Sequence, residues 1–175
     1  TAGTDFSASV SYVAERCGLR SHPFQAALNA SDKTLMRSCF AKGGVPSPSF
    51  TKVGRGDIAA YLKQGLEAIS FPKVVKPVDN MGARGCRLIR RADEFLHSVE
   101  AAVSYSRTGR AILEDFMDGP EFSIDALLYE GTLTITGFAD RHIFYEPYFI
   151  EMGHTMPSAF DPDKKKELVA SFARG

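Results

Sequence analysis

The feature that most restricts the fold is a glycine-containing loop between two strand-like runs. Residues 72–77 end in Lys76-Pro77, residues 85–90 form the second run, and Gly82 and Gly85 mark the loop that joins them. Because a strand follows the loop where a helix would be needed, both the GxxxxGK[ST] phosphate loop and the dinucleotide-binding fingerprint are excluded. The pattern predicts a strand–loop–strand unit whose backbone N–H groups can approach an anion.

Helices are predicted wherever apolar residues recur at helical spacing. The first predicted helix turns Val10, Val13, Ala14 and Cys17 inward, and the second begins with Ser31 as its cap. The predicted helices cover residues 8–18, 31–42, 57–69 and 93–106, and a further helix begins at Asp161-Pro162.

Strands are predicted over residues 111–117 and from Glu121 onward, where apolar and polar residues alternate. Glu130-Gly131 has the form of a two-residue hairpin turn, and residues 132–140 return as the partner strand. Residues 144–158 have no periodicity and predict a loop. Hairpins that mix with isolated helices indicate an α+β fold and not a doubly wound parallel sheet.

Composition excludes several classes of function. Lysine plus arginine and aspartate plus glutamate number 21 each, so nothing indicates a nucleic-acid or membrane partner. The three cysteines lack CxxC spacing, which argues against disulfides and zinc and favours a reducing, cytoplasmic setting. The chain opens without methionine and stops just after a helical run, so we expect it to be part of a longer protein. The oligomeric state stays open, a dimer included.

Two lysines are candidate phosphate ligands. Lys76 lies at the end of a β-branched run, where it acts either as a point charge toward phosphate or as a surface lysine whose stem packs on apolar residues. Lys33 lies in the first turn of its predicted helix, where the helix dipole disfavours a cation unless an anion is held at the same end.

A second candidate region follows the strand at residues 111–117. The turn after Glu114-Asp115-Phe116-Met117 exposes backbone groups that can pair with the edge of a base, and Glu121 is placed to accept from ribose hydroxyls. The alternative is an ordinary β-turn with solvated acids. Arg141, at the end of the hairpin's return strand, is either a ligand-facing cation or one half of a surface ion pair.

Four segments in this order resemble the ATP-grasp superfamily, and the continuation to Ser158 resembles its amino-acid-ligase branch. The resemblance covers roughly residues 29–141. The segments are Ser31-Asp32-Lys33 to Met36-Arg37 with Gly44 to Pro48, Phe71 to Pro77, Gly82 to Cys86, and Ile112 to Asp125.

The resemblance implies a role for each candidate residue. Lys33 and Lys76 would contact nucleotide phosphates, and the glycine loop, with Asn80, Met81, Gly82 and Gly85, would close over them. Glu114 would accept from the adenine amino group, the backbone of Asp115, Phe116 and Met117 would complete the base site, and Glu121 would bind ribose. Arg141 would act catalytically near the γ-phosphate or an acyl-phosphate.

The resemblance also implies a fold and its subdivision. The expected fold is a fragment of the α+β ATP-grasp fold, an antiparallel sheet with helices in A and B subdomains, preceded by the tail of an α/β domain. Residues 1–28 would end that preceding domain and residues 29–70 would form a helical part. Residues 71–118 would form the subdomain of the glycine loop, and residues 119–175 the start of the C-terminal sheet.

The activity implied is that of an ATP-dependent ligase, which converts a small carboxylate to an acyl-phosphate and transfers it to an amine. The family's Mg²⁺ ligands, in a Glu-x-Asn type of motif, are expected beyond residue 175, so no metal residue is assigned and this piece alone is expected to be inactive. Alternatives are a biotin-carboxylase-like or carbamoyl-phosphate-synthase-like enzyme, a non-catalytic nucleotide-binding module, and an α+β domain without a nucleotide.

Overall fold

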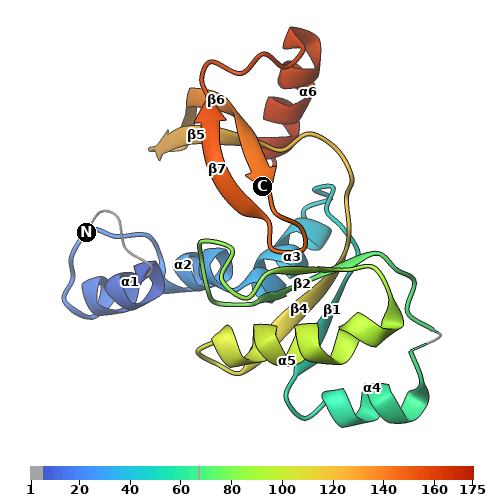
Figure 1. Ribbon diagram of the computed structural model, residues 1–175. Helices are drawn as coiled ribbons and strands as arrows, with labels where there is room; N and C mark the ends of the chain where they lie inside the picture. Colours follow the sequence, from blue (N-terminus) through green and yellow to red (C-terminus); the bar gives the residue numbers. More distant parts are fainter. Residues whose placement is uncertain (1–5, 67) are drawn as a thin grey trace.

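The computed structural model describes residues 6–66 and 68–175 of the chain (Figure 1). In this part of the chain the strands form two antiparallel sheets, of orders β1-β4-β2-β3 and β5-β6-β7. The fold class is therefore α+β, as predicted. The four-stranded sheet contains β1 (Phe50–Gly54), β2 (Lys73–Pro77), β3 (Arg87–Ile89) and β4 (Arg110–Asp115), and the three-stranded sheet contains β5 (Phe122–Tyr129), β6 (Thr132–Phe144) and β7 (Ile150–Thr155).

The main core lies between the four-stranded sheet and α5 (Phe95–Tyr105), which follows a short 3-10 turn, η1 (Ala92–Glu94). Phe95, Val99 and Val103 recur along one face of α5 and are buried against Val75 and Leu113 of the sheet. α4 (Ile58–Gln64) lies at the edge of this core through Ile58 and Tyr61. Strands β2, β3 and β4, the helix at 93–106 and the start of the helix after Asp57 confirm their predictions.

Strand β1 was not predicted. Residues 29–70 were expected to form a helical part, and that expectation is wrong for Phe50–Gly54, which form this strand. Five residues, Phe50–Gly54, pair with β4 in antiparallel register, from Phe50 opposite Glu114 to Gly54 opposite Arg110. The run is short and follows two prolines, so its sequence has no clear period of two. It becomes a strand because β4 offers an edge on which Val53 is buried.

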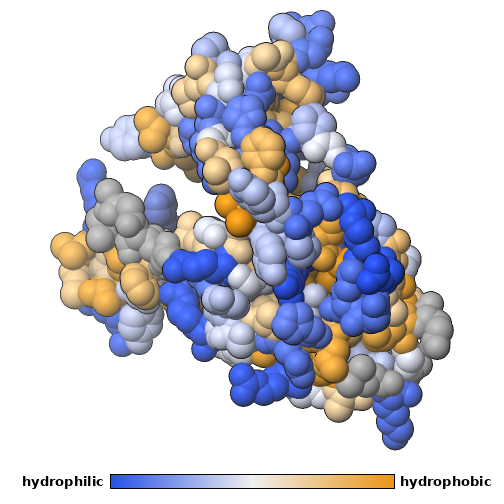
Figure 2. All heavy atoms as spheres, in the orientation of Figure 1, coloured by the Kyte–Doolittle hydropathy of each residue, from blue (hydrophilic) through white to orange (hydrophobic). Residues whose placement is uncertain are grey.

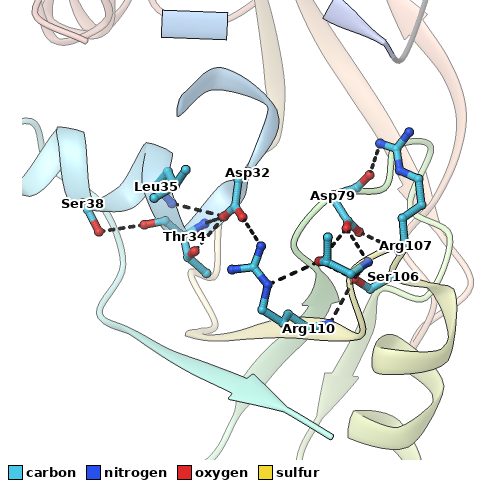
Figure 3. A network of polar contacts seen from close by, with 9 residues as sticks. Asp32, Thr34, Leu35, Ser38, Asp79, Ser106, Arg107 and Arg110 are labelled. Carbon is cyan, nitrogen blue, oxygen red and sulfur yellow. Dashed lines mark hydrogen bonds and ion pairs between the residues drawn. The ribbon is translucent and has the colours of Figure 1, made fainter. Parts of the chain in front are cut away.

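The helix predicted over residues 31–42 is confirmed as α3 (Lys33–Lys42), and a helix that was not predicted, α2 (Phe24–Ser31), ends just before it. Ser31 is not the cap: its hydroxyl donates to the carbonyl of Ala27 within α2. Asp32 caps α3 instead, because its Oδ1 accepts from the backbone N–H groups of Thr34 (2.8 Å) and Leu35 (3.2 Å), as Figure 3 shows.

Helix α1 (Ser7–Arg16) packs against α2, and its apolar face is only partly buried. Ala14 is buried as predicted, whereas Val10, Val13 and Cys17 are exposed and the prediction that they face inward is wrong. Figure 2 shows hydrophobic residues at the surface over this helix. Periodicity identified the helix correctly but could not show which of its faces meets α2.

The three-stranded sheet begins with the predicted hairpin. Glu130 and Gly131 form its two-residue turn, both with positive φ (45° and 79°), between the paired residues Tyr129 and Thr132. β7 corrects the prediction of a loop over residues 144–158. Its residues are mostly exposed and include Gly153, so the sequence lacks the β-branched run that marks a strand. α6 (Pro162–Phe172) begins with Asp161 as cap and Pro162 at its first position, as predicted.

The two sheets belong to two lobes that are joined by the segment 116–121 (Figure 1). We call the four-stranded sheet with α3, α4 and α5 the four-stranded lobe, and the three-stranded sheet with α6 the three-stranded lobe. The loop of residues 145–149, between β6 and β7, is the β6–β7 loop, and residues 79–85 are the glycine loop. Within residues 6–66 and 68–175, every helix is too short or too polar to cross a lipid bilayer.

Candidate functional site

A cleft of about 980 Å³ lies between the two lobes. The four-stranded lobe contributes Arg37 from α3, Lys76 from β2 and Glu114 from β4, and the segment 116–121 forms part of the wall. The three-stranded lobe contributes polar and apolar side chains from β6, the β6–β7 loop and α6, among them Arg141, Ile143, Phe149, Lys164 and Leu168. The cleft therefore combines charged groups with apolar surface, as small-molecule sites do.

Glu114 is the centre of an ion cluster in this wall. Its side chain is 3% exposed, and each carboxylate oxygen has a cationic partner. Arg37 Nε contacts Oε1 at 2.6 Å and Lys76 Nζ contacts Oε2 at 2.5 Å. Burial alone would raise the pKa of Glu114, but the hydrogen bond from Arg37 and the charge of Lys76 outweigh burial and lower it. Glu114 is therefore ionised and holds two cations from two different elements.

Lys33 is a third cation near this cluster, held against the start of the glycine loop. Its Nζ donates to the carbonyl of Asn80 at 2.7 Å, and its backbone N–H donates to the carbonyl of Val78 at 2.9 Å. Burial lowers the pKa of Lys33 and the neighbouring charge of Lys76 lowers it further, against the opposing effect of Asp79 and Glu114. Lys33 is therefore within electrostatic reach of one other lysine, Lys76, and of two carboxylates, Asp79 and Glu114.

The end of β4 and the residues that follow it, Asp115, Phe116 and Met117, line the cleft. The N–H groups of Asp115 and Phe116 donate to the carbonyls of Ser49 and Pro72, and the carboxylate of Asp115 pairs with Lys73. Met117 lines the cleft and is exposed. The backbone of this stretch is thus fixed by two bonds just before the chain leaves the sheet.

Arg141 lies on the opposite wall between two carboxylates. Its Nε donates to Glu151 at 2.9 Å, its Nη2 contacts the same oxygen, and its Nη1 donates to Glu121 at 3.3 Å. The two backbones are also joined, because the N–H of Arg141 donates to the carbonyl of Glu121. The β5–β6 pairing therefore brings Arg141 and Glu121, which are far apart in the sequence, to one place in the cleft.

The glycine loop separates this cleft from a second hollow of about 820 Å³, lined by Gly82, Gly85, His97, Tyr105 and Arg141 among others. The loop is anchored at its start by Asp79, whose carboxylate accepts from the backbone N–H groups of Arg107 (3.1 Å) and Thr108 (2.9 Å). Figure 3 shows Asp79 beside Arg107. At its end Gly85 packs against Pro77 and Tyr105. Cys86 follows, and burial raises the pKa of its thiol to about 11.

A family model described as the ATP-grasp domain matches residues 69–174. The chain belongs to the ATP-grasp family. Alanine–anticapsin ligase of Bacillus subtilis is 27% identical over 186 residues, an alignment that covers 94% of this chain and 38% of that ligase. D-alanine–D-alanine ligase of Granulibacter bethesdensis is 28% identical over 149 residues, covering 83% of this chain and 46% of the ligase.

Comparison with solved structures agrees on the fold. The crystal structure of an L-amino acid ligase from Bacillus licheniformis superposes with a TM-score of 0.79 at 23% identity, over 95% of this chain and 38% of that one. The chain thus spans less than half the length of each of these three relatives. The expected ATP-grasp fold, in a chain that matches part of its relatives, is confirmed.

The structure brings most of the predicted ATP-grasp site residues to one cleft. Those in its wall are Lys76, Glu114, Asp115, Phe116, Met117, Glu121 and Arg141. Gly82 and Gly85 lie in the wall of the second hollow, Asn80 lies in the glycine loop, and Lys33 lies beside that loop and donates to the carbonyl of Asn80. Met81 is exposed at the surface of that loop. Their roles toward a nucleotide stay predictions.

Arg37 is the main residue of this site to which sequence reasoning gave no role. It lies one helical turn after Lys33, so the two side chains share a face of α3. That spacing could have indicated Arg37 as a second cation on the same face. The apolar side chains of the other wall, such as Phe149 and Phe160, lacked a signal because they follow turns without periodicity.

Proposed function

We propose that the cleft binds ATP, and that the whole protein containing this sequence uses it to join a small carboxylate to an amine. The observation that carries the proposal is the ion cluster of Arg37 and Lys76 on Glu114, with Lys33 close to Lys76 and bonded to the glycine loop. These three cations outnumber the two neighbouring carboxylates, Glu114 and Asp79, and polyphosphate can neutralise the excess positive charge. We assign this chemistry to the cytoplasm, where ATP is available.

The proposed orientation of ATP follows the two walls. The adenine lies at the end of β4. Glu114 and the backbone carbonyls of residues 115–117 accept hydrogen bonds from its amino group, and the backbone N–H of Met117 donates to its ring nitrogen. Apolar contact comes from Phe149 and Met117. The ribose hydroxyls donate to Glu121. The phosphates extend toward Lys76, Lys33 and the glycine loop, and Arg141 faces the γ-phosphate from the other lobe.

The reaction proposed is acyl transfer by way of an acyl-phosphate. A substrate carboxylate attacks the γ-phosphate of ATP, ADP leaves, and the amine then displaces phosphate to form an amide. Arg141, Lys33 and Lys76 stabilise the charge that spreads over the phosphate oxygens. The glycine loop and the β6–β7 loop limit access of water to the intermediate.

Mg²⁺ would accompany ATP and neutralise part of its charge. Across residues 6–66 and 68–175 there is no group of three or more His, Cys, Asp or Glu side chains that could hold a metal ion. We propose that the Mg²⁺ ligands lie elsewhere in the whole protein.

The test is phosphate release by the whole protein with ATP and Mg²⁺, screened over pairs of amino acids. At least one pair should give release, and Lys76→Ala should lower the rate by about 10²-fold or more, the usual effect of removing a group that stabilises transition-state charge. Lys73→Ala is the matched control, because it removes the same charge from the same strand but pairs with Asp115. Equal rates for wild type and Lys76→Ala would overturn the assignment.

The screen also separates the alternatives. Bicarbonate-dependent phosphate release without an amino acid would indicate a carboxylase-like or carbamoyl-phosphate-type enzyme. ATP binding without release under any condition would indicate a non-catalytic nucleotide-binding module. The names of the relatives, which are amino-acid ligases, support the leading proposal.

A further inference from the structure

The two cations on Glu114 are held in different ways. Arg37 reaches Oε1 through Nε, and its guanidinium carbon also lies 5.9 Å from the ring centre of Phe40, one turn along α3. Lys76 reaches Oε2 through a single ammonium at the end of a flexible stem. Both side chains keep about a fifth of their surface exposed toward the cleft (20% for Arg37 and 22% for Lys76).

If a buried carboxylate had only one cationic partner, that cation could not leave without a large cost in free energy. Removal of the cation would leave an unpaired buried charge, which is far more costly than loss of a surface ion pair. Glu114 has two partners, so one of them can leave while the other keeps the charge compensated. The planar guanidinium of Arg37 also contacts the ring of Phe40, whereas Lys76 holds Glu114 through one ammonium on a stem of rotatable bonds.

We propose that Arg37 is a positioning residue that stays on Glu114 as a permanent counter-ion, so that Lys76 can move from Glu114 to a nucleotide's polyphosphate. When Lys76 leaves, Oε2 of Glu114 becomes free to accept a hydrogen bond from the amino group of adenine. Recognition of the phosphates and of the base are thereby coupled through one carboxylate. This inference rests on the proposed function of the cleft.

The experiment is a double-mutant cycle on ADP binding, measured by calorimetry with the whole protein. Arg37→Ala should weaken ADP binding about tenfold, because Lys76 then stays locked on Glu114; coupling of this size is usual for contacting charges. In a Glu114→Gln background, Lys76 has no carboxylate to leave, so adding Arg37→Ala should change ADP affinity less than about twofold. Arg37→Lys, which keeps a cation near Oε1, should recover part of the lost affinity.

Several outcomes would overturn the inference. Equal loss on Arg37→Ala in both backgrounds would mean that Arg37 contacts the nucleotide directly, and an unchanged affinity would mean that it has no part in binding. Lys42→Ala, which removes a charge from the last turn of the same helix, is the control for general electrostatics and should leave ADP affinity unchanged. If Arg37→Ala does not fold, Arg37→Lys against the Glu114→Gln background decides by the same comparison. A wild-type protein that binds no ADP would instead refute the proposed function itself.

Discussion

At the scale of single residues, two glycines of one loop have the same backbone conformation and different surroundings. Gly82 and Gly85 both have positive φ, 66° and 76°. A Cβ on Gly82 would meet nothing within 4 Å, whereas a Cβ on Gly85 would lie 2.8 Å from Cβ of Tyr105 and 2.9 Å from Cγ of Pro77. Gly82 is thus required only for its backbone angle, and Gly85 for its angle and for space.

This contrast predicts unequal costs for two identical substitutions. Gly82→Ala should lower the free energy of unfolding by about 1–2 kcal/mol, the cost of a left-handed conformation for an L-residue. Gly85→Ala should cost about 1–3 kcal/mol more, because packed neighbours must move. Urea unfolding of both variants measures the difference. Equal losses would show that Pro77 and Tyr105 give way without strain.

The candidate residues differ in how far the sequence could predict them. Lys76 and Glu114 could be predicted as candidates because each lies at or near the end of a run that reads as a strand. The direct contact between Lys76 and Glu114 could not be predicted, because it depends on the pairing register of β2 and β4. That register places Val74 opposite Glu114 and Lys76 opposite Ile112, so Lys76 and Glu114 are diagonal neighbours. The contact of Arg37 with Glu114 could not be predicted either, because the two residues are 77 positions apart and lie on different elements.

At the scale of elements, the β6–β7 loop docks on the edge strand of the other lobe. The N–H of Leu88 in β3 donates to the carbonyl of Pro147 at 2.9 Å. On one side Arg87 donates to the hydroxyl of Tyr148 at 2.7 Å and lies over its ring, and on the other Arg90 pairs with Glu146. The loop therefore covers the open edge of β3 and joins the two lobes.

We expect Arg87 to control how tightly this loop is held. Arg87→Ala removes both the hydrogen bond and the ring contact with Tyr148, so hydrogen exchange at the Leu88 amide should quicken about five- to tenfold. Arg91→Ala is the control, because Arg91 pairs with Asp93 and Glu94 of its own turn. The measurement is the hydrogen-exchange rate of the Leu88 amide in both variants, by NMR or mass spectrometry. The same Leu88 rate in both variants would show that the loop is held without Arg87.

Strands β1 and β7 show where the sequence pattern stops predicting elements. Both are edge strands with mostly exposed or half-buried residues, and each owes its pairing to a longer neighbour, β4 or β6. The strands with a buried face, β2 and β4, were evident because apolar residues dominate them. Edge strands lack that constraint, so tertiary pairing decides their conformation.

At the scale of the whole molecule, the candidate site belongs to neither lobe alone. Lys76 and Glu114 come from the four-stranded lobe, and Arg141 and Phe149 from the three-stranded lobe. The covalent link between the lobes, residues 116–121, lines the same cleft. A ligand in the cleft therefore contacts both lobes and the segment that joins them.

ADP should accordingly slow hydrogen exchange in both lobes at once. Protection is expected in peptides that contain residues 114–121 and in those that contain residues 141–149, because both line the cleft. Helix α1, whose residues lie outside the cleft lining, serves as the internal control and should exchange equally with and without ADP. Protection restricted to one lobe would place the nucleotide outside this cleft.

The anchors of the glycine loop set a limit on its reach. Asp79 is bonded to the turn at residues 107–108, and Gly85 is wedged against Pro77 and Tyr105, so five residues lie between two fixed points. The six steps from residue 79 to residue 85 span at most ~21 Å when fully extended, so the middle of the loop lies at most ~10 Å from its anchors. So short a tether limits the glycine loop to displacements of this size, and any larger closure over a polyphosphate would have to come from the lobes.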